Sequence, residues 1–106
     1  MIAAFVDDLL FRSKIRAVAA HTGAEVVFVK TAADPALARA SLAIVDLDGP
    51  GGVATIAALA AFVPRPRVVG FVSHVNAERI RDARAAGPVE VMARSAFVNA
   101  LPDLLT

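Results

Sequence analysis

Five short apolar runs recur along the chain, and segments with helical spacing lie between them. The runs are near-continuously apolar and rich in valine, isoleucine or phenylalanine, and they cover residues 2–6, 24–29, 42–45, 67–72 and 89–92. Continuous apolar runs of this length are typical of parallel strands that are covered on both faces. The pattern therefore predicts five buried strands.

Helical patterns fill the gaps between these runs. The first helix is indicated by an apolar stripe at helical spacing, formed by Phe11, Ile15 and Val18. Its other side is basic, with Arg12, Lys14 and Arg16, and we expect this side to be solvated. Asp34 and Pro35 predict an N-cap and a first helical position. We expect the helix that they open to make about two turns and to end near Ala40.

Three further helices are expected in the second half of the chain. The segment 53–62 carries no charged residue. Asn76 is predicted to cap a helix over 77–86, and Gly87 to stop it. Ser95 is predicted to cap the last helix, and Pro102 to break or restart it.

The alternation of strand and helix decides the fold class. Strand and helix in turn, five times over, imply a parallel sheet with helices on both faces. Because such connections are right-handed, few topologies remain for five units in 106 residues. We therefore predict one α/β domain over residues 1–106, a flavodoxin-like, doubly wound, five-stranded parallel sheet with strand order 2-1-3-4-5.

Composition limits the classes of function. A hydrophobic content of 58% is ample for one core, and a net charge of +1 argues against nucleic-acid binding by bulk electrostatics. The absence of cysteine excludes disulfides and thiol chemistry, and is consistent with a reducing cytoplasm. Mean hydropathy is +0.65, but the longest apolar stretch, 53–63, is shorter than the ~20 residues that span a bilayer. We expect a soluble, cytoplasmic domain that contacts neither nucleic acid nor membrane.

Polar side chains follow the ends of four predicted strands. They are Asp7 and Asp8 after the first strand, Asp46 and Asp48 after the third, Ser73 and His74 after the fourth, and Arg94 after the fifth. Because ligands of doubly wound sheets bind at the carboxyl ends of the strands, we expect these groups to share one crevice. Three carboxylates so close would repel one another and favour Mg²⁺. An aspartate would then be the nucleophile toward a phosphoryl group whose oxygens Arg94 and Ser73 bind.

Three motifs lie at these strand ends: VDD at 6–8, DLDGPG at 46–51 and AAGPVEVMAR at 85–94. With them the chain resembles the receiver domains of bacterial two-component response regulators over nearly its whole length. The resemblance implies that Asp46 is the phosphoacceptor and that Asp8 and Asp46, with Asp7 beside them, bind Mg²⁺. It also implies that the Ser73 hydroxyl follows the phosphoryl group. Signalling would run through a protein partner such as a histidine kinase or an output protein, with no enzyme activity beyond self-phosphorylation and dephosphorylation.

Two positions depart from the receiver pattern. Receivers have a lysine followed by a proline where this chain has Arg94 and Ser95, and an aromatic switch residue where it has Val91. Arginine keeps the charge but is a longer, planar group. The sequence leaves open a phosphorylated receiver and a degenerate pseudo-receiver that binds partners without phosphorylation, and the departures slightly favour the second.

Other interpretations remain open for the same residues. DLDG also resembles the motif of haloacid dehalogenase phosphatases, but these need a downstream lysine, and both lysines here, Lys14 and Lys30, lie upstream, which makes this a minor alternative. A purely structural interpretation makes Asp8 a helix N-cap and 46–49 a turn. Arg94 would then only pair with an aspartate.

Two helices are candidates for partner contacts. The helix expected over 53–62 is apolar all round, and we hypothesise that its outer side contacts another protein or a second copy of this chain. The alternative contact is the helix over 77–86, whose expected outer side carries Glu78, Arg79, Arg81, Asp82 and Arg84.

Overall fold

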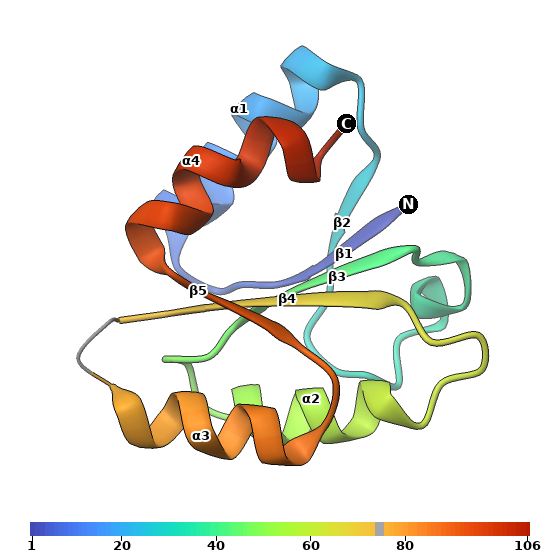
Figure 1. Cartoon of the computed structure of the whole chain (residues 1–106). Coiled ribbons are helices and arrows are strands. Elements are labelled where there is room, and N and C mark those ends of the chain that lie inside the picture. The colour runs from blue at the N-terminus through green and yellow to red at the C-terminus, as the bar shows by residue number, and fades with distance from the viewer. Residues whose placement is uncertain (74–75) are drawn as a thin grey trace.

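Five parallel strands form one sheet with helices on both faces (Figure 1). The computed structural model describes residues 1–73 and 76–106. The strands are β1 (Ile2–Phe5), β2 (Val26–Phe28), β3 (Leu42–Asp46), β4 (Arg67–Val72) and β5 (Glu90–Ala93), and their order is β2-β1-β3-β4-β5. All four pairings are parallel. The predicted flavodoxin-like class and strand order are confirmed.

The helices form two layers. In the described part of the chain they are α1 (Leu9–Thr22), the 3₁₀-helix η1 (Pro35–Arg39), α2 (Gly52–Ala60), α3 (Ala77–Ala86) and α4 (Arg94–Leu104). Figure 1 shows α1 and α4 together on one face of the sheet, and α2 and α3 side by side on the other. Successive strand residues point to opposite faces, so each strand feeds both layers of the core.

Three stacked phenylalanines fill the layer between the sheet and α1 and α4. Phe71 of β4 lies between Phe11 of α1 and Phe97 of α4, with ring centroids 4.8 and 4.5 Å away and interplanar angles of 16° and 18°. All three are buried. The Thr22 hydroxyl donates to the Leu105 carbonyl at 2.9 Å, which joins the end of α1 to the end of the chain.

The layer of α2 and α3 combines buried aliphatic side chains with close approach at two glycines. A Cβ on Gly87 would lie 2.9 Å from the Ala60 Cβ, and a Cβ on Gly70 would lie 2.7 Å from a methyl carbon of Leu47. Leu47 is fully buried. Glycine at these positions lets α3 approach α2, and lets Leu47 lie against β4.

Side-chain caps start two of the helices as predicted. Asp34 Oδ1 accepts a hydrogen bond from Ala36 N at 2.9 Å, and Asn76 Oδ1 accepts one from Arg79 N at 3.2 Å. The helix after Asp34 is a 3₁₀-helix of five residues. Since β3 begins soon after it, only short-range hydrogen bonds close this segment.

The predictions for the last helix were wrong at both ends. α4 begins at Arg94 with Ala93 as its N-cap, so Ser95 lies inside the first turn, and Pro102 lies within the helix. A proline removes one backbone donor, but Leu105 N still donates to the Leu101 carbonyl at 3.0 Å. Leu101 and Leu105 are buried, and this packing keeps the turn around Pro102 helical.

The outer side of α2 carries only small side chains. Its large apolar residues, Ile56 and Leu59, are buried, while Ala54, Ala57 and Ala58 are exposed. A pattern that is apolar all round therefore reflects alanine on the outside, whose exposure costs little. In residues 1–73 and 76–106, no helix has the length and apolar character needed to cross a membrane.

Candidate functional site

The segment after β3 folds back tightly at the carboxyl edge of the sheet. Leu47 N donates to the Phe71 carbonyl at 2.9 Å, so the chain stays paired with β4 just beyond Asp46. Gly51 has a φ of 80°, in the left-handed region that glycine enters without strain. A Cβ on Gly52 would lie 2.8 Å from the Asp46 carbonyl oxygen. The glycines thus let the start of α2 lie close to Asp46, the last residue of β3.

The two aspartates of this segment hold it in a turn. Asp46 Oδ1 accepts a hydrogen bond from Asp48 N at 3.0 Å, and Asp48 Oδ2 accepts one from Ser73 N at 2.8 Å. The second bond ties the turn to the residue that follows β4. Ser73 thus lies at the predicted edge and reaches the site through its backbone N–H. The turn expected after Asp46 is present.

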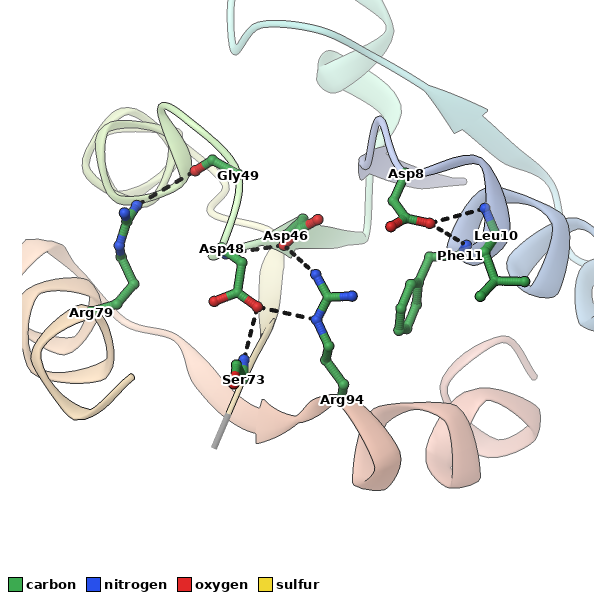
Figure 2. Close-up of polar contacts among 9 residues, drawn as sticks. All are labelled: Asp8, Leu10, Phe11, Asp46, Asp48, Gly49, Ser73, Arg79 and Arg94. Atoms are coloured by element: carbon green, nitrogen blue, oxygen red, sulfur yellow. Dashed lines mark hydrogen bonds and ion pairs between the residues drawn. The ribbon is translucent and has the colours of Figure 1, made fainter. Parts of the chain in front are cut away.

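Arg94 points from the first turn of α4 toward both aspartates (Figure 2). Its Nε donates to Asp48 Oδ2 at 3.1 Å, and its Nη2 lies 3.7 Å from Asp46 Oδ1. The guanidinium carbon is 4.7 Å from the Phe11 ring centroid and 5.6 Å from that of Phe71. The aromatic stack of the core therefore supports the guanidinium, and carboxylates bind its nitrogens.

Burial decides the electrostatics of Asp46. The exposed fraction of its side chain is 12%, against 22% for Asp48 and 35% for Arg94. Burial raises the pKa of Asp46 above its ordinary value, while the Asp48 N–H and the Arg94 charge act in the opposite direction. Ionisation of the Asp46 carboxyl is therefore less favourable than for a free aspartate. The Arg94 charge offsets part of the cost of its burial.

Asp8 is the N-cap of α1. Its Oδ1 accepts hydrogen bonds from Leu10 N at 2.9 Å and from Phe11 N at 3.1 Å, as Figure 2 shows. Two backbone donors at the start of a helix are thereby satisfied. The expected N-cap at Asp8 is present, and one oxygen of this predicted metal ligand already accepts hydrogen bonds from the start of α1.

Asp7 is exposed, and it shares a pocket with Asp46 that is separate from the Arg94 contacts. With Lys30, these two aspartates contribute to the lining of a small pocket of about 90 Å³. Within the described residues, Arg94 is not among those that line it. His74, which was also expected at this edge, lies outside the described residues.

The residues present do not fit Mg²⁺ in this arrangement. Among residues 1–73 and 76–106, no three His, Cys, Asp or Glu side chains gather closely enough to hold a metal ion. Asp7, Asp8 and Asp46 are therefore not brought into one cluster. The Arg94 cation lies within 3.7 Å of Asp46, where it would repel a divalent cation.

Two contacts of the site escaped the sequence analysis. Asp48, which was expected among the acids at this edge, joins Arg94 to Ser73 N, and this link was not predicted. The available signal was that Asp48 follows the same strand end as Asp46. Arg79 had been placed on the outer side of its helix, but it is partly buried and its Nη1 donates to the Gly49 carbonyl at 3.5 Å.

Comparison with known proteins gives similarity in structure alone. No family model and no curated protein sequence matches the chain. A response regulator from Thermotoga maritima matches with a TM-score of 0.73 and 18% identity, over 97% of this chain and 91% of that one. A response regulator receiver domain from Rhodospirillum rubrum matches with a TM-score of 0.67 and 18% identity, over 97% and 89%.

A longer protein contains the same fold. NtrX from Brucella abortus matches with a TM-score of 0.73 and 20% identity, over 98% of this chain and 26% of that one. The similarities cover both helical layers and the whole sheet, because nearly every residue of this chain is aligned. The chain therefore has the fold of response regulator receiver domains.

Proposed function

We propose that this chain is a receiver-like signalling module that acts through protein–protein interaction, with Arg94 in the role that Mg²⁺ has in the receiver family. The observation that carries the proposal is the pairing of Arg94 with both Asp46 and Asp48. In this form the module is a degenerate receiver, which binds its partner without phosphorylation. The fold alone does not choose between the two forms, so the choice rests on these contacts.

The contacts of Asp46 support this choice. Its Oδ1 already accepts the Asp48 N–H and faces the Arg94 guanidinium. A nucleophilic carboxylate needs a cation that can neutralise the incoming phosphoryl oxygens, and here the nearby cation, Arg94, is already paired with Asp46 and Asp48. Arg94 would have to leave Asp46 and Asp48 to serve the phosphoryl group, at the cost of two charge-assisted contacts.

The alternative is a phosphorylated receiver that uses the same residues. In that case Asp46 is the phosphoacceptor, and Arg94 and the Ser73 hydroxyl contact the phosphoryl oxygens. Mg²⁺ would replace Arg94 beside the carboxylates, and Arg94 would move to the phosphoryl group. Asp7, Asp8 and Asp46 would have to draw together around Mg²⁺.

Partners and location belong to the same proposal. The partner is a protein such as a histidine kinase or an output protein, and binding takes place in the cytoplasm. The exposed alanines of α2, with Ala54, Ala57 and Ala58, stay a candidate contact for a second copy of the chain. No contact with nucleic acid or membrane is part of the proposal.

Phosphorylation is tested by intact mass after incubation with Mg²⁺ and a small acyl phosphate donor. We expect no gain of one phosphoryl group in the wild-type protein. Arg94→Lys, which restores the lysine of the receiver pattern, is expected to gain one, and Arg94→Lys with Asp46→Asn is the matched control that should lose it. An acid-stable, alkali-labile gain in the wild type that vanishes in Asp46→Asn would contradict the degenerate form and establish the phosphorylated one.

The phosphatase alternative predicts a different result. A haloacid-dehalogenase-like enzyme would turn over a phosphate ester many times, whereas a receiver is modified once at most. Asp48, the acid and base of that mechanism, is paired here with Arg94 and Ser73 N. We expect no release of phosphate from a chromogenic phosphate ester.

A further inference from the structure

An open groove runs between α1 and the edge strand β2, away from the Asp46 site. It is lined by apolar and basic side chains, among them Arg12, Arg16, Ala20, Val26 and Phe28. Helix periodicity predicts that both arginines lie on a solvated side of α1. In the structure both guanidinium groups turn onto Phe28, with their central carbons 4.5 and 4.7 Å from its ring centroid.

The two arginines form an uncompensated pair of positive charges. They lie four residues apart on one helix, where like charges repel. In the described part of the chain neither takes part in an ion pair, and the buried Nε of Arg12 has no hydrogen-bond partner there. A buried donor without a partner is costly, so an acceptor that entered the groove and reached this donor would be favourable. The two oxygens of one carboxylate would accept hydrogen bonds from both guanidinium groups, and its charge would offset one of the two positive charges.

The backbone of β2 offers a second kind of contact. β2 lies at the end of the sheet and pairs with β1 alone. Ile2 N donates to the Glu25 carbonyl and Val29 N donates to the Ala4 carbonyl, so the odd-numbered residues of this strand face β1. The backbone groups of Val26 and Phe28 therefore face away from the sheet, along the groove. A free strand edge accepts another extended chain.

We propose that an extended, acidic segment of a partner protein adds to β2 as a further strand. The segment places a carboxylate on Arg12 and Arg16 beside Phe28. Charge complementarity and the free backbone edge together select a peptide, because a nucleic acid would use the arginines but leave the N–H and C=O groups of Val26 and Phe28 unused. The net charge of +1 also gives no general attraction to nucleic acid.

This proposal deepens the proposed function by naming the chemistry of the partner. It rests on the module acting through a protein, but not on Arg94 or on the state of Asp46. The groove residues and the Asp46 site can therefore be tested separately. Phosphorylation of the wild type would overturn the degenerate form without changing the prediction for the groove.

The probe is a fluorescent synthetic peptide of alternating glutamate and valine, followed by anisotropy. The matched control peptide has lysine in place of glutamate. We expect the acidic peptide to bind, the basic one not to bind, and Arg12→Gln with Arg16→Gln to weaken binding about tenfold or more, a loss of about 1.4 kcal/mol. Lys14→Gln with Arg81→Gln removes the same charge outside the groove and should change binding less than about twofold.

Hydrogen exchange on the wild-type protein tests the strand addition without any variant. The peptide should slow exchange of the Val26 and Phe28 amides, while the Val27 amide, which faces β1, should not change. Equal binding by the two double variants would overturn the proposal. So would tighter binding of a single-stranded oligonucleotide than of the acidic peptide, or bound peptide without protection at Val26 and Phe28.

Discussion

The two helical layers of the sheet both bury large apolar side chains, but they differ in which side chains fill them and in where the backbone packs closely. The layer of α1 and α4 is filled by large rings, since Phe11, Phe71 and Phe97 stack across it. The layer of α2 and α3 buries aliphatic side chains such as Leu47, Ile56 and Leu59, and it also has close backbone contacts at Gly52 and Gly87, where a Cβ would meet backbone or side-chain atoms within 3 Å. The first layer should therefore be sensitive to the loss of a ring, and the second to volume added at its glycines.

The Asp46 site is built where these two layers meet. Arg94 belongs to the aromatic layer, because it starts α4 and lies over Phe11 and Phe71. Asp46 and Asp48 belong to the turn that Gly52 allows at the start of α2. The ion pairs therefore join the two layers at the carboxyl edge of the sheet, and a change in either layer should reach the site.

The largest effect is expected from removing a ring of the stack. Phe97→Ala should lower the free energy of unfolding by about 3–5 kcal/mol, because a fully buried ring is lost and a cavity is left. Denaturant unfolding measures it. Phe97→Leu is the control and should cost less than about 1.5 kcal/mol. Similar losses for the two variants would show that the stack is not tightly packed.

The next effect comes from adding one methyl group to the opposite layer. Gly52→Ala should cost about 1–3 kcal/mol, because its Cβ would lie 2.8 Å from the Asp46 carbonyl oxygen and 3.0 Å from the Leu47 Cα, which are backbone atoms that cannot turn away. Gly49→Ala is the matched control, since its nearest contact would be an ordinary 3.5 Å. If both variants unfold alike, close approach at Gly52 is not what limits this layer.

A smaller effect is expected from breaking the link between the layers. Arg94→Ala should cost about 1–2 kcal/mol, because it leaves the half-buried Asp46 and Asp48 without their cation. Arg67→Ala breaks the exposed pair with Glu90 and should cost about 0.2–1 kcal/mol. Thermal unfolding at low and at high salt separates the two, since the exposed pair is screened more strongly. Equal losses would mean that the Arg94 pairs act as surface pairs.

The smallest effect concerns the charge of Asp46. Its pKa is raised in the folded state, mainly by burial, so ionisation opposes folding. The stability that the neutral carboxyl contributes is complete below the ordinary pKa of 3.8 and is lost as pH rises through the higher folded-state pKa. Asp46→Asn should therefore unfold at a slightly higher temperature than wild type at neutral pH, with the difference closing in acid. A variant that is less stable at neutral pH would contradict this assignment.

The sequence predicted the sheet because periodicity and order carry it. Five apolar runs in alternation with helices leave few arrangements, and the observed strand order is the expected one. The caps at Asp34 and Asn76 were predictable for a similar reason, since a cap depends on residues two or three positions away. Local rules failed at Pro102, where buried leucines on either side outweigh the preference of proline.

Side-chain direction was the part of the site that the sequence could not supply. Arg94 was expected at the crevice, but the sequence did not predict that its guanidinium would pair with Asp48 in particular and lie over the ring of Phe11. Arg79 and Arg12 were both assigned to solvent from helix periodicity, and both turn inward to acceptors or rings on other elements. Long basic side chains reach beyond the face on which periodicity places them.

Titration of Mg²⁺, followed by the backbone amides of the wild type and of Arg94→Ala, is the most direct test of the role assigned to Arg94. With the guanidinium between the layers, the wild type should show no saturable shifts at Asp46, Asp48 or Asp8. Arg94→Ala should bind Mg²⁺ more tightly, because the carboxylates are then left without a cation. Saturable binding at Asp46 and Asp8 in the wild type, with no gain in Arg94→Ala, would contradict the replacement of the metal by Arg94.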